Sequence, residues 1–319
     1  MNTRRILSID GGGIKGVFPV AFLASIEEEI KAPIGSYFDL IAGTSTGGII
    51  ALGLGLGFWA RDLLSFYEEL GPKVFPGNRL FRSLRWIGFS KYDKKPLRQA
   101  LISKFHDRKV GDSKVRLIIP SLNLETGEVY IYKTAHHPRF QKDYKESVAD
   151  VAMATAAAPS YFPAHRNSSG LPLVDGGTWA NNPTGIAVVE ATGVLGWAPS
   201  ELRVLSLGCT MPVFDIGIGR KFGMGLFYWA DKIASVFMSG QSSGSLGIAN
   251  LLVGDQNMFR ISPIVPSRRF SLDGIKDVES LKGLGFSEAR KALPSIRPIF
   301  FEKSAESFEP FHRVSVASE

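Results

Sequence analysis

Hydrophobic residues recur along the chain with two different periods. Short apolar runs, alternating or continuous, predict strands, and longer segments with apolar residues every three or four positions predict helices. The predicted strands cover residues 5–10, 38–42, 115–123, 129–134, 171–174 and 203–207. The predicted helices cover residues 17–31, 61–70, 97–105, 148–158 and 278–293, and another begins at Gly48. Because strands alternate with helices, we expect an α/β fold with a mainly parallel central sheet flanked by helices.

The pattern divides the chain into a clear and a weak part. At 319 residues it is long enough for one large domain with an extension. The periodic signals are clear over residues 1–192. They weaken over residues 193–319, where stretches rich in glycine and serine cover 217–225 and 239–247. We therefore expect one main domain, 1–192, and a C-terminal part, 193–319, of the same globular unit.

Composition places the chain among soluble globular proteins. Hydrophobic residues make up 45% and charged residues 21%. A single cysteine, Cys209, excludes an internal disulfide and fits a reducing compartment, and its apolar neighbours predict a place in the core. The N-terminus has no apolar signal-peptide segment, and the uncharged run 40–60 contains six glycines, which suits a buried strand–turn–helix. We expect a cytoplasmic protein without a transmembrane segment.

The net charge of +7 is concentrated in one region. Residues 77–114 contain eleven basic and three acidic residues. Within this region, residues 79–89 interleave arginines with leucine, phenylalanine and tryptophan, a mixture that suits an anionic membrane surface. A solvated face explains the charge equally well. No nucleic-acid motif accompanies the segment, so we expect no nucleic acid polymer as a partner.

The segment Gly43-Thr44-Ser45-Thr46-Gly47 lies between a predicted strand and a predicted helix. A Gly-x-Ser-x-Gly pentapeptide in that position is typical of a nucleophile elbow, which exposes the serine hydroxyl above the sheet. The flanking Gly43 and Gly47 allow the close backbone approach that such a turn requires. The following helix N-terminus offers amide donors to a developing anion. Ser45 is therefore a candidate nucleophile.

A serine hydroxyl needs a base, and the sequence offers one in another strand-end turn. The turn Asp175-Gly176-Gly177 follows an apolar strand, and a partly desolvated carboxylate there has its pKa raised toward the range of a general base. No histidine lies in a strand-end glycine turn; the five are His106, His136, His137, His165 and His312. Asp175 is therefore the candidate proton acceptor.

A third glycine turn, at residues 10–16, follows the first predicted strand. The N–H groups of Gly11, Gly12 and Gly13 would converge on a tetrahedral oxyanion, where loss of one donor typically costs roughly 10²–10³ in rate. Lys15 would add positive charge nearby. The pattern predicts acyl transfer through a serine and an aspartate, and its supporting residues are Lys15, Gly43, Gly47, Gly176 and Gly177.

The same turn leaves an alternative, because Gly11, Gly13 and Gly16 also satisfy the Gly-x-Gly-x-x-Gly pattern of a dinucleotide-binding loop. The acidic residue expected about 20 residues later should end a second strand. Residues 27–29 instead lie inside a predicted helix. A phosphate loop of the Walker type fails because glycine follows Lys15. A nucleotide-binding signalling protein with secondary or no hydrolase activity stays the alternative, although it leaves the other two turns unexplained.

These motifs, together with Thr155-Ala156-Ala157-Ala158-Pro159 and Asn181-Asn182-Pro183, resemble the patatin-like phospholipases over roughly residues 5–190. The resemblance implies a patatin-like three-layer sandwich, with 1–192 as the catalytic domain. It implies hydrolysis of acyl esters in phospholipids by a Ser45–Asp175 dyad, with the glycine turn as oxyanion hole. Because the site lacks metal-ligand spacing, we expect no metal there, and we expect no cofactor. Lys15 departs from the arginine that is more common in the family, which keeps the charge but loses a planar donor.

The chain also resembles the bacterial branch of this family that serves as effectors in anti-phage signalling by cyclic oligonucleotides. The resemblance implies activation by a cyclic dinucleotide and action at the inner face of the membrane. An effector pocket would then lie in residues 193–319, near basic residues such as Arg268 and Arg269. Ordinary loop charge explains either arginine singly, and assembly as a homo-oligomer stays open.

Overall fold

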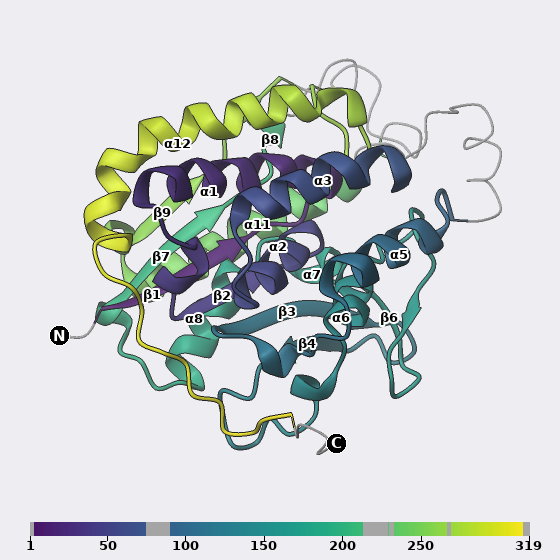
Figure 1. The fold of residues 1–319 in the computed structure, drawn as a ribbon, viewed down its shortest axis with the longest axis horizontal. Coiled ribbons are helices and arrows are strands. Elements are labelled where there is room, and N and C mark those ends of the chain that lie inside the picture. Colours follow the sequence, from purple (N-terminus) through teal and green to yellow (C-terminus); the bar gives the residue numbers. More distant parts are fainter. Residues whose placement is uncertain (1–2, 75–89, 213–228, 230–232, 267–268, 315–319) are drawn as a thin grey trace.

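The centre of the structure is an eight-stranded sheet, shown in Figure 1. A computed structural model describes residues 3–74, 90–212, 229, 233–266 and 269–314. The strand order is β5-β6-β3-β2-β1-β7-β9, and β4 pairs with β3 off this path. The strands are β1 (Arg4–Ile9), β2 (Leu40–Gly43), β3 (Arg116–Asn123), β4 (Val129–Lys133), β5 (His165–Arg166), β6 (Pro172–Asp175), β7 (Leu202–Leu207) and β9 (Met258–Ile261). Two short strands, β8 (Met211–Pro212) and β10 (Ile264–Val265), pair apart from this sheet.

The middle of the sheet is parallel and one side of it is antiparallel. Strand β1 pairs in parallel with β2 and β7, and β2–β3 and β7–β9 are parallel too. Strand β3 pairs antiparallel with β4 and β6, and β5 pairs antiparallel with β6. The expectation of a mainly parallel central sheet is confirmed.

Alternate residues of the strands enter two separate cores. Leu7 and Ile9 of β1 pack in a large cluster, whereas Ile6 packs in a smaller one on the opposite face. Helices of the large-cluster face are α1 (Val17–Ile30), α2 (Thr46–Gly55), α3 (Ala60–Val74), α5 (Lys94–Phe105), α6 (Val148–Thr155) and α12 (Val278–Phe300). The opposite face is covered by α8 (Thr184–Gly193) and α11 (Ile233–Val253). The expected three-layer α/β/α sandwich is thus confirmed.

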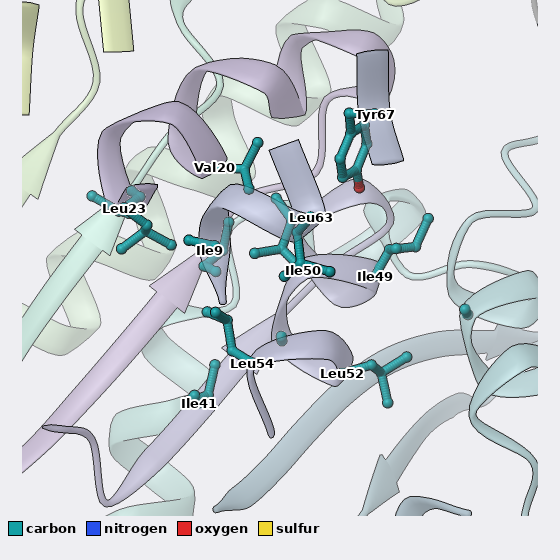
Figure 2. Packing of buried hydrophobic residues seen from close by; sticks show 14 of the residues in the cluster. Ile9, Val20, Leu23, Ile41, Ile49, Ile50, Leu52, Leu54, Leu63 and Tyr67 are labelled. Atoms are coloured by element: carbon teal, nitrogen blue, oxygen red, sulfur yellow. The ribbon is translucent and has the colours of Figure 1, made fainter. Parts of the chain in front are cut away.

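The large core joins the first strands to the helices that follow them. Figure 2 shows Ile9 and Ile41 of the sheet together with Val20 of α1 and Ile50 of α2; all four belong to the large cluster and are buried. The hydroxyl of Tyr67 on α3 donates to the carbonyl oxygen of Thr46 at 2.8 Å, which links α3 to the first turn of α2. This contact holds the helix that begins directly after Ser45.

Two elements of the C-terminal part differ from the sequence expectations. The last helix was expected to end at 293, before Pro294, but α12 continues through Pro294 and Pro298 to Phe300. Phe300 is fully buried against the core, and this packing outweighs the two missing backbone hydrogen bonds. The Gly/Ser stretch 239–247, which carries no helical signal, lies in the middle of α11.

Several sequence features fall outside the described residues. These are the basic segment 79–89, the glycine-rich stretch 217–225 and Arg268. Within the part of the chain that the structure describes, no helix combines the length and the apolar character needed to cross a bilayer. The boundary between residues 192 and 193 stays a prediction.

Close backbone contacts around the turn at Ser45 give a first prediction. A Cβ atom on Gly47 would lie 2.3 Å from the carbonyl oxygen of Ile9. Gly47→Ala is therefore expected to lower the free energy of unfolding by at least about 2 kcal/mol, because strand and helix must separate. Urea denaturation measures this change. Gly193→Ala is the matched control, since a Cβ there meets nothing within 4 Å; equal losses in both variants would contradict the prediction.

Candidate active site

Two strands pair with the same side of β3 and run toward each other. Strand β2 runs parallel to Arg116–Ile118, and β6 runs antiparallel to Ser121–Asn123. The C-terminal ends of β2 and β6 therefore meet at the gap opposite Ile119 and Pro120. Ser45 follows β2 after one intervening residue, and Asp175 is the last residue of β6. The topology thus brings these two residues together from distant parts of the chain.

Thr155, at the end of α6, links β3 to the turn at Ser45 through two hydrogen bonds. Its hydroxyl donates to the carbonyl oxygen of Pro120 at 2.6 Å and accepts from the N–H of Ser45 at 3.0 Å. The N–H of Asp175 donates to the carbonyl oxygen of Ala157 at 3.0 Å. The fully buried Thr155 therefore fixes the position of the Ser45 backbone relative to β3.

Ser45 has the backbone conformation of a sharp turn. Its φ of 55° and ψ of −121° lie in the positive-φ region that side-chain-bearing residues rarely adopt. The turn is held by close contacts, because a Cβ on Gly43 would lie 2.1 Å from the carbonyl oxygen of Gly47. Ser45 also caps the N-terminus of α2. The local geometry is that of the nucleophile elbow predicted from the sequence.

Asp175 lies in the cavity wall with its carboxyl group almost completely buried. It is 4% exposed, and burial raises its pKa to about 6. A hydrogen bond from Ser45 and the N–H of Gly177, which donates to Asp175 Oδ1 at 2.6 Å, oppose this rise. A carboxyl group that titrates near neutrality while holding a serine hydroxyl is suited to accept and return a proton.

The glycine turn after β1 lies beside Ser45, and its N–H groups differ in their partners. The N–H of Gly11 donates to the carbonyl oxygen of Asn181 at 2.9 Å, so it is not directed at a substrate. Gly12 and Gly13 line the cavity together with Ser45. Gly13 has a φ of +58°, and a Cβ there would collide with the carbonyl oxygen of Leu272. We therefore keep Gly12 and Gly13, but not Gly11, as candidate oxyanion donors.

The backbone of this turn is held by the C-terminal part of the chain. The N–H of Ile14 donates to the carbonyl oxygen of Leu272 at 2.9 Å. Asp10, at the start of the turn, accepts two hydrogen bonds from Arg260 of β9, at 2.8 and 2.6 Å. Such a bidentate pair fixes orientation as well as distance. Sequence reasoning missed Arg260 and Leu272, because both lie where the periodic signal is weak.

These bonds also bear on the nucleotide-binding alternative. A phosphate-binding loop presents free backbone N–H groups to its ligand. Here the N–H groups of Gly11, Ile14 and Lys15 donate to carbonyl oxygens of the protein. These N–H groups are therefore not available to a phosphate, and the turn lines the cavity at Ser45. This geometry favours the hydrolase interpretation over a nucleotide-binding loop.

Lys15 and Cys209 lie behind the glycine turn. The described residues that line the cavity do not include Lys15, and burial lowers the pKa of its amine. Cys209 is 4% exposed, its thiol contacts the carbonyl oxygen of Asp10 at 3.4 Å, and burial raises its pKa to about 12. The thiol is therefore a core group, as its neighbours in the sequence predict.

The described histidines have structural contacts away from this site. His136 is buried between Thr134 at 2.9 Å and Glu190 at 3.0 Å, and His165 pairs with Asp150 at 3.3 Å. Among the described residues that line the cavity there is no histidine. This arrangement leaves Asp175 as the titratable group beside the Ser45 hydroxyl.

The cavity itself is apolar and has a volume of about 420 Å³. Ser45, Asp175 and Asn181 are among the few polar groups in its wall, whereas most of the lining is aliphatic or aromatic. The apolar wall includes Ile49, Leu70, Val74, Leu97, Phe162 and Phe237. A cavity of this kind holds a hydrophobic ligand and orients it through a small number of polar groups.

The raised pKa of Asp175 gives a second prediction. A carboxyl group whose folded pKa lies above its unfolded value destabilises the protein once pH rises through that range, here from about 4 to about 6. Asp175→Asn is therefore expected to raise the free energy of unfolding at pH 7.5, by as much as about 3 kcal/mol. Urea denaturation at pH 7.5 and at pH 4 measures this. A gain no larger at pH 7.5 than at pH 4 would contradict the burial argument.

Comparison with known proteins agrees with this geometry. A cGAMP-activated phospholipase of Pseudomonas aeruginosa is 35% identical over 285 residues, which are 88% of this chain and 82% of that protein. A cGAMP-activated phospholipase of Vibrio cholerae is 38% identical over 257 residues, or 73% of this chain and 72% of that protein. Patatin-like protein 2 of Arabidopsis thaliana is 35% identical over 288 residues, or 80% of this chain and 67% of that protein.

A family match covers the region that forms the site. The family described as patatin-like phospholipase matches residues 7–188, a span that holds the glycine turn, Ser45 and Asp175. Arg260 and Leu272, which hold the glycine turn from behind, lie beyond it. Together with the relatives above, this match shows that the chain belongs to the patatin-like phospholipase family.

Proposed function

We propose that the protein is a serine lipid acyl hydrolase of the phospholipase A type, with Ser45 as nucleophile and Asp175 as proton acceptor. The observation that carries the proposal is the hydrogen bond between these two side chains in the wall of an apolar cavity. The strained turn at Ser45 supports it, because such strain is typical of a nucleophile held in place by its surroundings. Membership of the family supports the reaction class.

The geometry supports a two-step reaction. Asp175 takes the hydroxyl proton while Ser45 Oγ bonds to the ester carbonyl carbon, and the carbonyl oxygen becomes an oxyanion. The N–H groups of Gly12 and Gly13 would stabilise that oxyanion. Collapse breaks the ester bond, and the leaving alkoxide takes the proton back from Asp175. Water then attacks the acyl-enzyme, with Asp175 again accepting and returning the proton.

The proposed substrate is a membrane phospholipid. The apolar lining suits an acyl chain, and Ser45 lies in the wall of the same cavity. We propose that the protein acts from the cytoplasm at the inner face of the membrane. The basic segment 79–89, which lies outside the described residues, is a proposed site of contact with anionic lipid.

The proposed activator is a cyclic dinucleotide. This proposal is supported by two relatives, from Pseudomonas aeruginosa and Vibrio cholerae, that are named cGAMP-activated phospholipases. Arg269, one of the basic residues considered for an effector pocket, is exposed, and its guanidinium lies 3.7 Å from the carboxylate of Asp277. Its loop also holds Leu272, whose carbonyl oxygen contacts the glycine turn. A ligand in the C-terminal part would thus act close to the oxyanion donors.

Hydrolysis of phosphatidylglycerol–phosphatidylethanolamine vesicles tests the dyad. Ser45→Ala and Asp175→Asn are each expected to lower fatty-acid release at least about 10³-fold, because each removes one partner of a unit that acts together. The wild-type rate is expected to rise as pH passes through about 6, where Asp175 ionises. Mass spectrometry of the released fatty acids measures these rates. Ser200→Ala and Asp255→Asn, both exposed, are the matched controls, and near-wild-type rates in either dyad variant would overturn the assignment.

A panel of cGAMP, cyclic di-GMP and cyclic di-AMP tests activation. We expect one member to raise the vesicle hydrolysis rate at least about tenfold, because an activator must favour the competent state by about 1.4 kcal/mol for that change. Titration calorimetry measures binding alongside activity. Binding that leaves hydrolysis unchanged would favour the nucleotide-binding alternative, and the absence of both effects would contradict activation by these ligands.

A further inference from the structure

Helix α11 turns two of its serines toward the protein. Ser242 and Ser245 are buried, and both contact the turn that precedes α8. Asn182 Nδ2 donates to Ser242 Oγ at 3.0 Å, and the N–H of Gly185 donates to Ser245 Oγ at 2.8 Å. The inward face also buries Ala249 and Val253, so it is mixed in polarity, whereas a surface helix usually turns an apolar stripe inward.

One exposed stripe of α11 is apolar along the length of the helix. Phe237 is 69% exposed, Ile248 51% and Leu251 89%, and Ile233 and Leu252 are also exposed. At 100° per residue, positions 237, 244, 248 and 251 lie within a narrow stripe. The segment Ile233–Val253 contains no charged residue. A continuous apolar stripe of this kind on a globular protein marks an interaction surface.

Glycines occupy the middle of the same stripe. A Cβ placed on Gly240, Gly244 or Gly247 would meet nothing within 4 Å. Glycine in a helix interior is unfavourable relative to alanine, so a glycine there needs a reason. Within the described residues, no neighbouring atom lies close enough to require glycine at these three positions. Small residues on a helix do allow the backbone of another helix to approach closely.

The stripe is complementary to itself about Gly244. In an antiparallel pair of α11 helices with Gly244 opposite Gly244, the residue numbers of two facing positions add up to 488. Phe237 then faces Leu251, and Gly240 faces Ile248, on both sides of the centre. Glycine therefore meets glycine at the crossing, Gly240 leaves room for the larger Ile248 beside it, and two large apolar residues meet toward the ends. A two-fold contact requires this kind of self-complementarity.

The residues of α11 itself favour a second copy over a lipid surface, because the segment Ile233–Val253 contains no charged residue that could contact lipid headgroups. Helices that lie in a membrane interface instead carry lysine and arginine on their polar face. The polar side chains of Ser242 and Ser245 on α11 are instead bonded to the protein.

We propose that α11 binds the α11 of a second copy of this chain, antiparallel and centred on Gly244. The contact adjoins the cavity, because Phe237 is both a cavity-lining residue and the residue that Leu251 of the second copy covers. A helix of this length spans about 30 Å. One helix pair buries less than a standard interface, so we expect a weak and reversible dimer.

Sedimentation velocity of the full chain over about 1–100 μM tests the proposal against Gly244→Leu. The wild type is expected to show a monomer–dimer equilibrium. Gly244→Leu is expected to raise the dissociation constant at least about tenfold, because two leucine side chains must occupy the crossing. Ser243→Leu is the matched control, since its exposed side chain is turned about 100° away from Gly244. A wild type that stays monomeric, or a Gly244→Leu dimer of unchanged affinity, would overturn the proposal.

The same variant distinguishes binding of α11 to a second copy from binding of α11 to a bilayer. Leucine favours helix over glycine, so Gly244→Leu is not expected to lower the melting temperature. It also makes the stripe more apolar, so stronger binding of Gly244→Leu to phosphatidylglycerol vesicles, with a monomeric wild type, would assign α11 to lipid contact and overturn the proposal. Under mild oxidation Gly244→Cys is expected to form a disulfide-linked dimer and Ser243→Cys is not. The buried Cys209 does not interfere, and equal cross-linking of both variants would contradict the register.

Discussion

The site depends on one constraint of the sheet: β2 and β6 share a single side of β3 and point at each other. Strand β2 is parallel to β3 and β6 is antiparallel to it. The C-terminal ends of β2 and β6 therefore meet at one gap beside β3, and Ser45 and Asp175 lie there. Pro120 lies at that gap, where its carbonyl oxygen accepts from Thr155. Ser45 and Asp175 therefore meet through backbone pairing, and their hydrogen bond needs no flexible loop to form.

The rest of the site is built around this meeting point from distant segments. Burial of Asp175 by the surrounding layers sets its pKa near neutrality, and the glycine turn is positioned from behind. Arg260 holds Asp10 and the carbonyl oxygen of Leu272 holds Ile14, so the C-terminal part supports the candidate oxyanion donors directly. This connection gives a physical route by which a ligand or a second copy bound to the C-terminal part would change activity.

Much of this arrangement was predictable from the sequence, and the missing parts share a physical reason. Ser45, Asp175 and the glycine turn carry local signals, because a sharp turn between strand and helix demands glycines at fixed spacing. Arg260 and Leu272 act through tertiary contacts and carry no such signal. The narrowing of the oxyanion donors to Gly12 and Gly13 also depends on a distant residue, Asn181. Helix α11 was missed because its glycines and serines have low helix propensity, and the contacts of its buried residues Ser242, Ser245, Ala249 and Val253 override that propensity.

The central claim is that the fold makes the Ser45 hydroxyl nucleophilic through Asp175. Covalent labelling by a fluorophosphonate, followed by mass spectrometry of the labelled peptide, measures that nucleophilicity without a membrane or an activator. The account predicts a single adduct at Ser45, a labelling rate that rises as pH passes through about 6, and near-complete loss of labelling in Asp175→Asn. An adduct at another serine, or equally fast labelling of Ser45 in Asp175→Asn, would contradict it.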